Sequence, residues 1–274
     1  MKKFLLFISV VALISSCGSF GKILKSNDID YKYKKAVEYY NDKKYSYVIQ
    51  IFGPDFFPLL KGTKEFEEAF YMYAYSHYYE KDYFNSENLF RQFCETFTTS
   101  PRIAEIEYMR AYTYYRQSPK IELEQTNTVK TIGMMSTFAN KYPESKEAKE
   151  AFEIIEKCKA KIELKELKAA ELYYNIGQYK AAAIAFNNML LTFPETNRGD
   201  EYKYMSIKAF YLYAGQSVEE RKEERYEQLI LDCNDFVDKF PESKLITEVE
   251  KYNINCANNI KTIKNEQTKK TTSS

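Results

Sequence analysis

The chain has 274 residues, enough for one large domain or two small ones with a substantial core. Lys and Arg number 40 against 39 for Asp and Glu, so the whole chain has no net field for gathering nucleic acid, and no nucleic-acid partner is expected. With 26 Tyr and 19 Phe beside only eight Gly, the composition is typical of a folded, helix-compatible chain and not of a disordered one.

The first residues are typical of a signal peptide and not of the fold. Lys2 and Lys3 precede an apolar run from Phe4 to Ile14, which is too short for an ordinary membrane anchor. The next residues, Ile-Ser-Ser-Cys-Gly ending at Gly18, resemble the bacterial lipobox that lipoprotein signal peptidase reads. The resemblance implies that residues 1–16 are removed and that Cys17 becomes the lipidated first residue. The alternative is an ordinary secretory signal followed by an incidental cysteine.

Lipidation at Cys17 would place the protein on a membrane without spanning it. Several acyl chains on one cysteine give stable anchoring, where a single chain would be marginal. The next residue is Gly18 and not the Asp that retains many lipoproteins at the inner membrane. We therefore expect an outer-membrane, lipid-anchored protein facing the periplasm, held by a tether that covers residues 17–28.

Near-identical segments recur along the chain and indicate repeats. Lys-Tyr-Pro-Glu-Ser-Lys at 141–146 returns as Lys-Phe-Pro-Glu-Ser-Lys at 239–244, with Thr-Phe-Pro-Glu-Thr-Asn between them at 192–197. Pro58 and Pro101 extend the series, whose prolines stand 43, 42, 51 and 47 residues apart. Because proline cannot continue a helix but fits the first turn of the next one, each proline is expected to end one helix pair.

The fourth copy matches the tetratricopeptide pattern, in which a small residue, a Tyr, an Ala, a Phe and a closing Pro follow one another at fixed spacing. These positions are supplied in register by Ala170, Tyr173, Ala182, Phe186 and Pro194. Two copies begin near Ala36 and Ala74, and the third and fifth copies run from 104 to 143 and from 202 to 241. The sequence therefore predicts an all-α solenoid of about five tetratricopeptide-like helix pairs.

The repeats fall into two groups. Residues 29–143 contain repeats 1–3, and residues 144–264 contain a long helix joining repeats 3 and 4, then repeats 4 and 5, and a C-terminal capping helix from 244 to 264 that covers the last apolar face. Polar loops are expected at 117–128 and 216–225, between the helices of repeats 3 and 5. The polar residues 265–274 are expected to be a disordered tail.

Six tyrosines are candidates for a client-peptide groove. They recur at i, i+4 and i+7 on the first helices of repeats 2 and 3, beside the face expected to fill the core: Tyr71, Tyr75, Tyr78, Tyr108, Tyr112 and Tyr115. Tyrosine offers a large contact area and a hydroxyl at low entropic cost, which suits an extended peptide with aromatic side chains. The alternative is that these rings pack under a neighbouring repeat. Arg110 and Arg116 can receive a carboxylate, or belong to a solvated face.

The sequence contains no recognisable catalytic or metal-binding motif. The only histidine, His77, stands where the repeat places a packing residue, and the carboxylates alternate with lysines as on solvated helix faces. We expect no enzymatic activity, no cofactor and no metal. Apart from Cys17, the four cysteines are interpreted as small buried hydrophobes, although a bridge between Cys233 and Cys256 stays open.

The order of these parts resembles the BamD family, the lipoprotein subunit of the outer-membrane β-barrel assembly machinery. The resemblance rests on the lipobox at Cys17, the five repeats, the segment Ile-Ala-Glu-Ile-Glu-Tyr-Met-Arg-Ala from Ile103, the long helix from 152 to 175 and the run before Pro194. Two positions depart from the repeat pattern, Ser86 where it has Ala and Thr98 where it has Pro, and the tyrosine content is high.

This resemblance implies a non-enzymatic role in folding and inserting barrel proteins. It implies that the N-terminal repeats receive unfolded outer-membrane β-barrel proteins, with the six tyrosines as groove candidates. It also implies that the C-terminal repeats dock on a BamA-type outer-membrane insertase. Two alternatives are another tetratricopeptide lipoprotein, serving pilus secretion or cell-wall coordination, and a glycan-binding lipoprotein that feeds an outer-membrane transporter. Glycan sites of that kind usually use Trp, which this sequence lacks.

Overall fold

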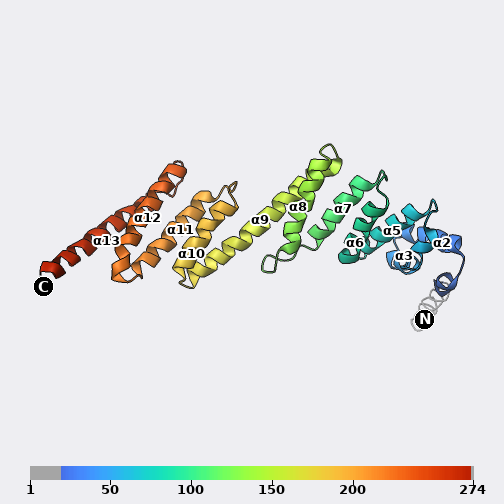
Figure 1. Cartoon of the computed structure of the whole chain (residues 1–274), viewed down its shortest axis with the longest axis horizontal. Coiled ribbons are helices and arrows are strands. Elements are labelled where there is room, and N and C mark those ends of the chain that lie inside the picture. Colours follow the sequence, from blue (N-terminus) through green and yellow to red (C-terminus); the bar gives the residue numbers. More distant parts are fainter. Residues whose placement is uncertain (1–19, 273–274) are drawn as a thin grey trace, which may run out of the picture. The chain divides into compact units, whose positions relative to one another are not determined.

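The computed structural model describes residues 20–272, and these residues form helices with no strand (Figure 1). The predicted signal peptide and the predicted lipidation site, Cys17, lie outside the described residues. The chain divides into two compact units, one through Lys159 and one from Ala160. The predicted all-α fold of five tetratricopeptide-like helix pairs is confirmed.

The first unit holds the first three helix pairs. Its helices are α2 (Ile29–Asn41), α3 (Tyr45–Ile51), α4 (Phe57–Leu60), α5 (Phe66–Tyr79), α6 (Tyr83–Thr96), α7 (Ile103–Arg116), α8 (Thr126–Lys141) and the first half of α9 (Lys146–Asn175). The predicted loop between the two helices of repeat 3 is present at residues 117–125. Pro58 lies in the first turn of α4, an extra short helix, and so begins a helix there instead of closing one.

The second unit holds the remaining two pairs and the closing helix. It contains the second half of α9, then α10 (Tyr179–Thr192), α11 (Gly199–Gly215), α12 (Glu219–Lys239) and α13 (Ile246–Thr272). Helix α9 has 30 residues without interruption, as predicted for the helix between repeats 3 and 4. Its residues Ala151, Ile154, Ile155 and Cys158 are buried with repeat 3, whereas Leu167 and Ala170 are buried with repeat 4.

Small residues stand where the two helices of a pair touch. They let the helix axes come close together, because a close-packed core has no room for a larger side chain at the contact. Ala74 and Phe90 are both fully buried in repeat 2, and Ala170, Ala182 and Phe186 are fully buried in repeat 4. Tyr173, which the pattern places beside Ala170, is instead 43% exposed. The alanine and phenylalanine positions of the pattern therefore form the core, and this tyrosine position does not.

Repeats 2 to 5 each end in the same tight turn, built from an aromatic residue and a hydroxyl residue three positions later. The backbone N–H of the hydroxyl residue donates to the carbonyl of the aromatic one in the pairs Phe97–Ser100, Tyr142–Ser145, Phe193–Thr196 and Phe240–Ser243. The recurring Phe-Pro-Glu-Ser segments of the sequence are these turns. They end one helix and set the start of the next, so they fix the spacing of the pairs.

Three of these four hydroxyls bond to an acid near the start of the preceding repeat. The donors and acceptors are Ser100 to Glu67 at 2.7 Å, Thr196 to Glu163 at 2.6 Å and Ser243 to Asp200 at 2.7 Å. Each acid lies seven residues before a buried position of its repeat, namely Ala74, Ala170 and Ile207. In repeat 3 the equivalent position, seven before Ala111, is Ala104, and the hydroxyl of Ser145 is buried without a hydrogen-bond partner. The third junction therefore lacks one polar contact that the other three have.

A second repeated feature is a left-handed residue after the first helix of a pair. Gly177 has φ of +77° in repeat 4, and the equivalent positions in repeats 1 and 2 are Lys43 and Lys81, with φ of 60° and 64°. Glycine adopts this conformation readily because it has no Cβ, whereas the Cβ of any other residue is crowded by the backbone there. Two of the helix pairs therefore carry a strained turn where the fourth carries a relaxed one.

Three expectations from the sequence are wrong. Residues 20–25 are helical instead of belonging to an extended tether, and Phe20 and Ile23 are buried in the core of repeat 1. Residues 216–225 are not a long loop, because α12 begins at Glu219 and ion pairs from Lys222 to Glu219 and from Arg221 to Glu224 support its first turns. Residues 265–272, expected to be disordered, continue α13.

Of the cysteines that the structure describes, Cys94, Cys233 and Cys256 are free thiols. Cys158, Cys233 and Cys256 are buried, as their interpretation as small hydrophobes requires, whereas Cys94 is partly exposed. Burial raises the pKa of the Cys233 and Cys256 thiols to about 12 and that of Cys94 to about 11. A bridge between Cys233 and Cys256 is not formed.

Candidate functional site

The six candidate tyrosines come from α5 and α7, the first helices of repeats 2 and 3, and they form one connected series of ring contacts. Within α5 the centroid of Tyr75 lies 4.5 Å from that of Tyr71 and 6.5 Å from that of Tyr78. Tyr78 reaches across to Tyr112 of α7 at 6.4 Å. Tyr112 in turn contacts Tyr108 and Tyr115, each at 5.7 Å. The predicted tyrosines therefore lie together in the structure.

The six rings differ in exposure. Tyr75 and Tyr108 are each only 6% exposed, packed against Phe90 and Phe138 of the second helices of their own repeats. The other four are partly exposed, and we call them the tyrosine face: Tyr71, Tyr78, Tyr112 and Tyr115. In the free protein, Tyr75 and Tyr108 support this face from below and do not reach a ligand. The alternative interpretation of the stripe as packing residues therefore holds for two of the six.

A carboxylate that sequence analysis missed fixes the position of two rings. Glu105, in the first turn of α7, accepts hydrogen bonds from the Tyr71 hydroxyl at 2.8 Å and from the Tyr75 hydroxyl at 2.5 Å. Burial, followed by the hydrogen bond to Glu105, raises the pKa of both tyrosines, so both hydroxyls stay protonated at neutral pH. This arrangement ties α5 to α7 and leaves neither hydroxyl needing a further acceptor.

Two arginines flank the tyrosine face at its ends. Arg102 lies over the Tyr71 ring at 4.3 Å and pairs with Glu68 at 2.7 Å. Arg116 is exposed at the end of α7, and its guanidinium lies over the Tyr83 ring at 5.4 Å. Burial, the largest single effect, opposes its charge, but the contact with the Tyr112 hydroxyl and the neighbouring Tyr83 and Tyr78 together outweigh it and raise its pKa. Arg116 thus offers a fixed cation beside Tyr78 and Tyr112, which is the geometry that a carboxylate prefers.

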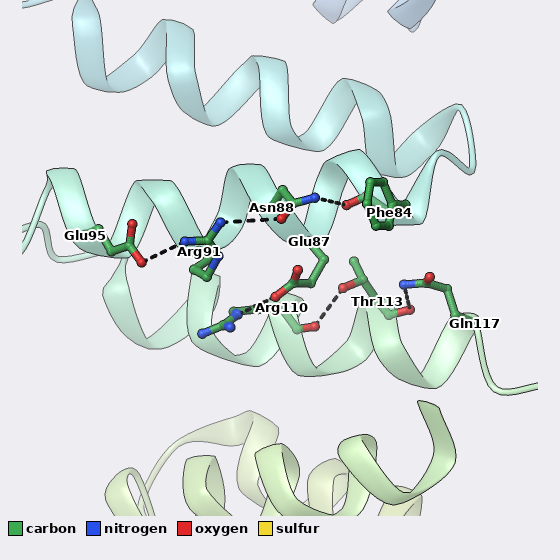
Figure 2. Close-up of polar contacts among 8 residues, drawn as sticks. All are labelled: Phe84, Glu87, Asn88, Arg91, Glu95, Arg110, Thr113 and Gln117. Atoms are coloured by element: carbon green, nitrogen blue, oxygen red, sulfur yellow. Dashed lines mark hydrogen bonds and ion pairs between the residues drawn. The ribbon is translucent and has the colours of Figure 1, made fainter. Parts of the chain in front are cut away.

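The other arginine considered from the sequence, Arg110, is already paired. Figure 2 shows its Nε donating to Oε1 of Glu87 across α6 and α7, at 2.7 Å. Arg91 and Asn88 lie along α6 beside this pair, and Arg91 pairs with Glu95 of the same helix (Figure 2). Arg110 therefore holds repeats 2 and 3 together and is not free to receive a ligand.

The tyrosine series extends beyond the predicted residues into repeat 1. Tyr79, which is 45% exposed, stacks on Tyr45 at 4.4 Å, and Tyr45 contacts Tyr40 at 5.6 Å. The i, i+4, i+7 spacing on α5 does not include Tyr79, so only the packing of α3 against α5 reveals it. The series of partly exposed tyrosine rings consequently runs over three repeats.

The single histidine of the sequence has a structural position. His77 is buried, and its Nδ1 lies 2.8 Å from Asp82, which caps the start of α6, so this histidine links the two helices of repeat 2. Within residues 20–272, no group of three or more His, Cys, Asp or Glu side chains is placed to hold a metal ion. The tyrosine face therefore presents partly exposed aromatic rings beside one exposed guanidinium.

None of the helices between residues 20 and 272 is long and apolar enough to cross a membrane. No curated protein matches the chain. The solved structures similar to it include the TPR2AB domain of yeast Sti1 in its complex with pHSP90, with 12% identity and a TM-score of 0.38, covering 84% of this chain and 98% of the other. Another is a set of nearly identical TPR-like repeats of a protein described as a kinesin light chain from Podospora anserina, with 10% identity and a TM-score of 0.33, covering 78% and 97%.

A family model gives the family. The model described as YfiO, outer membrane lipoprotein, matches residues 26–212, a range that contains repeats 1 to 4 and the whole tyrosine face. As this match covers well over half of the sequence, the chain belongs to the YfiO family of outer membrane lipoproteins.

Proposed function

We propose that this protein is the BamD-like scaffold of an outer-membrane β-barrel assembly complex, and that it acts without catalysing a reaction. In this proposal the acylated Cys17 anchors the chain to the periplasmic face of the outer membrane. The tyrosine face binds unfolded segments of barrel proteins, and the second unit docks on a BamA-type insertase. Membership of the outer membrane lipoprotein family supports this role.

The observation that carries client binding is the pairing of the tyrosine face with Arg116. Tyr78 and Tyr112 are partly exposed and lie side by side, and the exposed guanidinium stands at their edge. Aromatic anchors next to a cation are the groups that supply most binding energy in peptide recognition. A peptide that ends in an aromatic residue would place its ring on the tyrosines and its terminal carboxylate on Arg116.

The shape of the tyrosine face favours a peptide over a sugar. The planes of Tyr78 and Tyr112 meet at 50°, and those of Tyr112 and Tyr115 at 53°. Such tilted rings provide edges and hydroxyls for side chains and backbone groups, and form no continuous flat surface along which several sugar rings can stack. An oligosaccharide titrated in parallel should therefore leave the tyrosine fluorescence unchanged.

The second unit exposes apolar side chains that suit docking on another protein. Leu172 and Ile176 on α9 are 58% and 59% exposed, and Ile184 and Leu191 on α10 are 53% and 76% exposed. Exposed apolar groups of this kind are common at protein interfaces. Affinity purification from detergent-solubilised outer membranes, with mass spectrometry, tests the partner. Recovery of a barrel insertase in stoichiometric amount supports the proposal, whereas recovery of pilus components, cell-wall enzymes or a glycan transporter contradicts it.

Client binding is tested with a fluorescent peptide that copies the last strand of an outer-membrane barrel protein and ends in Phe with a free carboxylate. Tyr112→Ala and Tyr78→Ala should each weaken binding roughly tenfold or more, as for buried aromatic anchors at interfaces. Arg116→Gln should weaken binding of this peptide but not of its C-terminally amidated form. The control is Tyr173→Ala, which removes a more exposed tyrosine from α9, away from the tyrosine face. Equal affinity in all four variants would contradict the proposal.

A further inference from the structure

The residues that follow the predicted lipidation site are part of the fold. Phe20 and Ile23, at 9% and 3% exposure, are buried in the core of repeat 1. The Phe20 ring lies 4.3 Å from that of Tyr47 and 5.8 Å from that of Tyr39. Burial of these apolar side chains stabilises the contact. The chain is consequently held on the first repeat from Phe20 onward.

This attachment leaves little chain between the first repeat and the anchor. Only Gly18 and Ser19 separate Cys17 from Phe20. Consecutive Cα atoms stand at most about 3.8 Å apart, so the Cα of Cys17 lies within roughly 11 Å of the Cα of Phe20. A bilayer that holds acyl chains on Cys17 must therefore come close to the surface of repeat 1.

The same end of repeat 1 exposes apolar side chains around a hollow. Leu24, in the turn of helix that follows Phe20, is 37% exposed, and Leu59 of α4 is 56% exposed. Both line one cavity of about 240 Å³, together with Lys32, Gln50, Ile51, Gly53, Asp55 and Phe56. Two exposed leucines beside one hollow form a local apolar surface, which we call the anchor-end surface and define by Leu24 and Leu59.

Basic residues accompany this surface. Lys22 and Lys25 are exposed on the same helical turn as Leu24, and Lys32 lines the cavity. Lysine side chains near a bilayer extend their ammonium groups to the headgroups while their stems lie on apolar surface, and an anionic leaflet attracts them. Asp55 lines the same cavity and offsets the charge of Lys32, so the cations available at this end are the exposed Lys22 and Lys25.

We propose that the anchor-end surface rests on the leaflet that holds the lipid of Cys17, with Leu24 and Leu59 at the level of the acyl chains and Lys22 and Lys25 at the headgroups. The contact would fix the orientation of repeat 1 relative to the membrane. This inference rests on the lipidation of Cys17 in the proposed function, but not on client or insertase binding.

The absence of tryptophan from the sequence makes a direct test possible. The lipidated protein is prepared as Leu24→Trp and as Leu59→Trp, its anchor is verified by mass, and each variant is reconstituted into liposomes of phosphatidylethanolamine and phosphatidylglycerol. Lipids brominated on the acyl chain quench a tryptophan that touches them. Both variants should lose most of their emission, with a blue-shifted maximum before quenching.

The control is Phe84→Trp, which places the same probe at a 70% exposed position at the start of α6. Its emission should not change with bromination. Equal emission of all three variants would overturn the proposal, as would a blue shift that depends on protein concentration and not on bromination, since that pattern identifies a second copy as the occupant. A mature protein without acyl chains on Cys17 would also overturn it. Because no client is present, failure of client binding leaves the result unaffected.

Discussion

Arg110 of α7 and Glu87 of α6 form an ion pair of 2.7 Å in which the carboxylate is buried, at 7% exposure, while the arginine side chain is one-third exposed. The neighbouring Arg91 pairs with Glu95 instead, so the charge of Glu87 is balanced by Arg110 (Figure 2). The attraction within such an ion pair adds little to the free energy of unfolding. Removing one partner costs more than that, because the other charge stays buried without a partner.

Arg110→Met should therefore destabilise the first unit by about 1–3 kcal/mol, below the range for fully buried pairs because water reaches the arginine. Glu87→Gln combined with Arg110→Met should recover most of this loss, since no charge is left unpaired. Urea unfolding followed by circular dichroism measures both. A single variant as stable as the parent would contradict the assignment.

The unpaired hydroxyl of Ser145 predicts a stabilising substitution. Ala104→Glu places an acid where repeats 2, 4 and 5 carry Glu67, Glu163 and Asp200, each of which accepts a hydrogen bond from the matching hydroxyl. The new bond should add about 1 kcal/mol to the free energy of unfolding.

An acid in the first turn of α7 also favours the helix dipole, and this contribution must be separated. The control is Ala104→Glu in a Ser145→Ala background, where only the dipole effect remains. Ser145→Ala alone should be nearly neutral, whereas Ser243→Ala should cost about 1 kcal/mol because Oδ2 of Asp200 loses the donor that Ser243 supplies. Equal gains from Ala104→Glu in both backgrounds would show that the bond does not form.

The left-handed turn of repeat 2 predicts a second gain in stability. Lys81 has φ of 64°, where a Cβ atom is strained, so Lys81→Gly should stabilise the protein by about 0.5–1 kcal/mol. Gly177→Ala is the matched opposite: a Cβ there meets no atom within 4 Å, so any loss comes from backbone strain alone. Thermal unfolding should move the two variants in opposite directions, and a shift of the same sign would refute the strain argument.

The buried Lys203 predicts a pH dependence in the second unit. Its Nζ lies 2.9 Å from Asp232 and 3.1 Å from Asp235. Burial opposes the ionisation of Asp235, but hydrogen bonds from Lys239 and Lys203 outweigh it and lower the pKa below the ordinary 3.8. The unfolded chain therefore takes up this proton at a higher pH than the folded one. The stabilisation is present above pH 3.8 and is lost as the pH falls through the lowered pKa.

Lys203→Met removes one of the two lysines that lower the pKa of Asp235. The unfolding temperature of this variant should consequently fall less steeply below pH 3.8 than that of the parent. At alkaline pH the stabilisation is lost as the pH rises and not as it falls. Burial lowers the pKa of Lys203, but its two aspartates raise it by more, so this loss begins only above the ordinary pKa of 10.5. Identical pH profiles for parent and variant would show that this lysine does not shift Asp235.

The helix pairs were predictable because each depends on local spacing. Ala74, Ala170 and Ala182 occupy the close-approach positions of the pattern, and the structure buries each of them completely. The capping and turn residues act over three or four positions, so a single sequence suffices to place them. The long helix α9 was equally clear, since no Pro or Gly interrupts it.

The features that could not be predicted from the sequence depend on contacts between residues far apart in the chain. Periodicity puts Tyr71 and Tyr75 on one face, but Glu105 and Phe90 decide how deeply each ring lies. Phe20 and Ile23 look like part of a tether because the apolar signal is only two residues long, and only the core of repeat 1 shows where they pack. The polar start of α12 resembles a loop because its ion pairs replace apolar periodicity.

The uninterrupted course of α9 through the division of the two units has a consequence for proteolysis. Boundaries between compact units usually lie in exposed loops, where proteases cut first. Here the division falls between Lys159 and Ala160, inside a helix of 30 residues. A protease binds its substrate as an extended strand. Trypsin therefore cannot cleave after the lysines near this division until the helix unfolds locally. Digestion of the native protein should therefore begin at residues 117–125, between α7 and α8, and leave the two units joined.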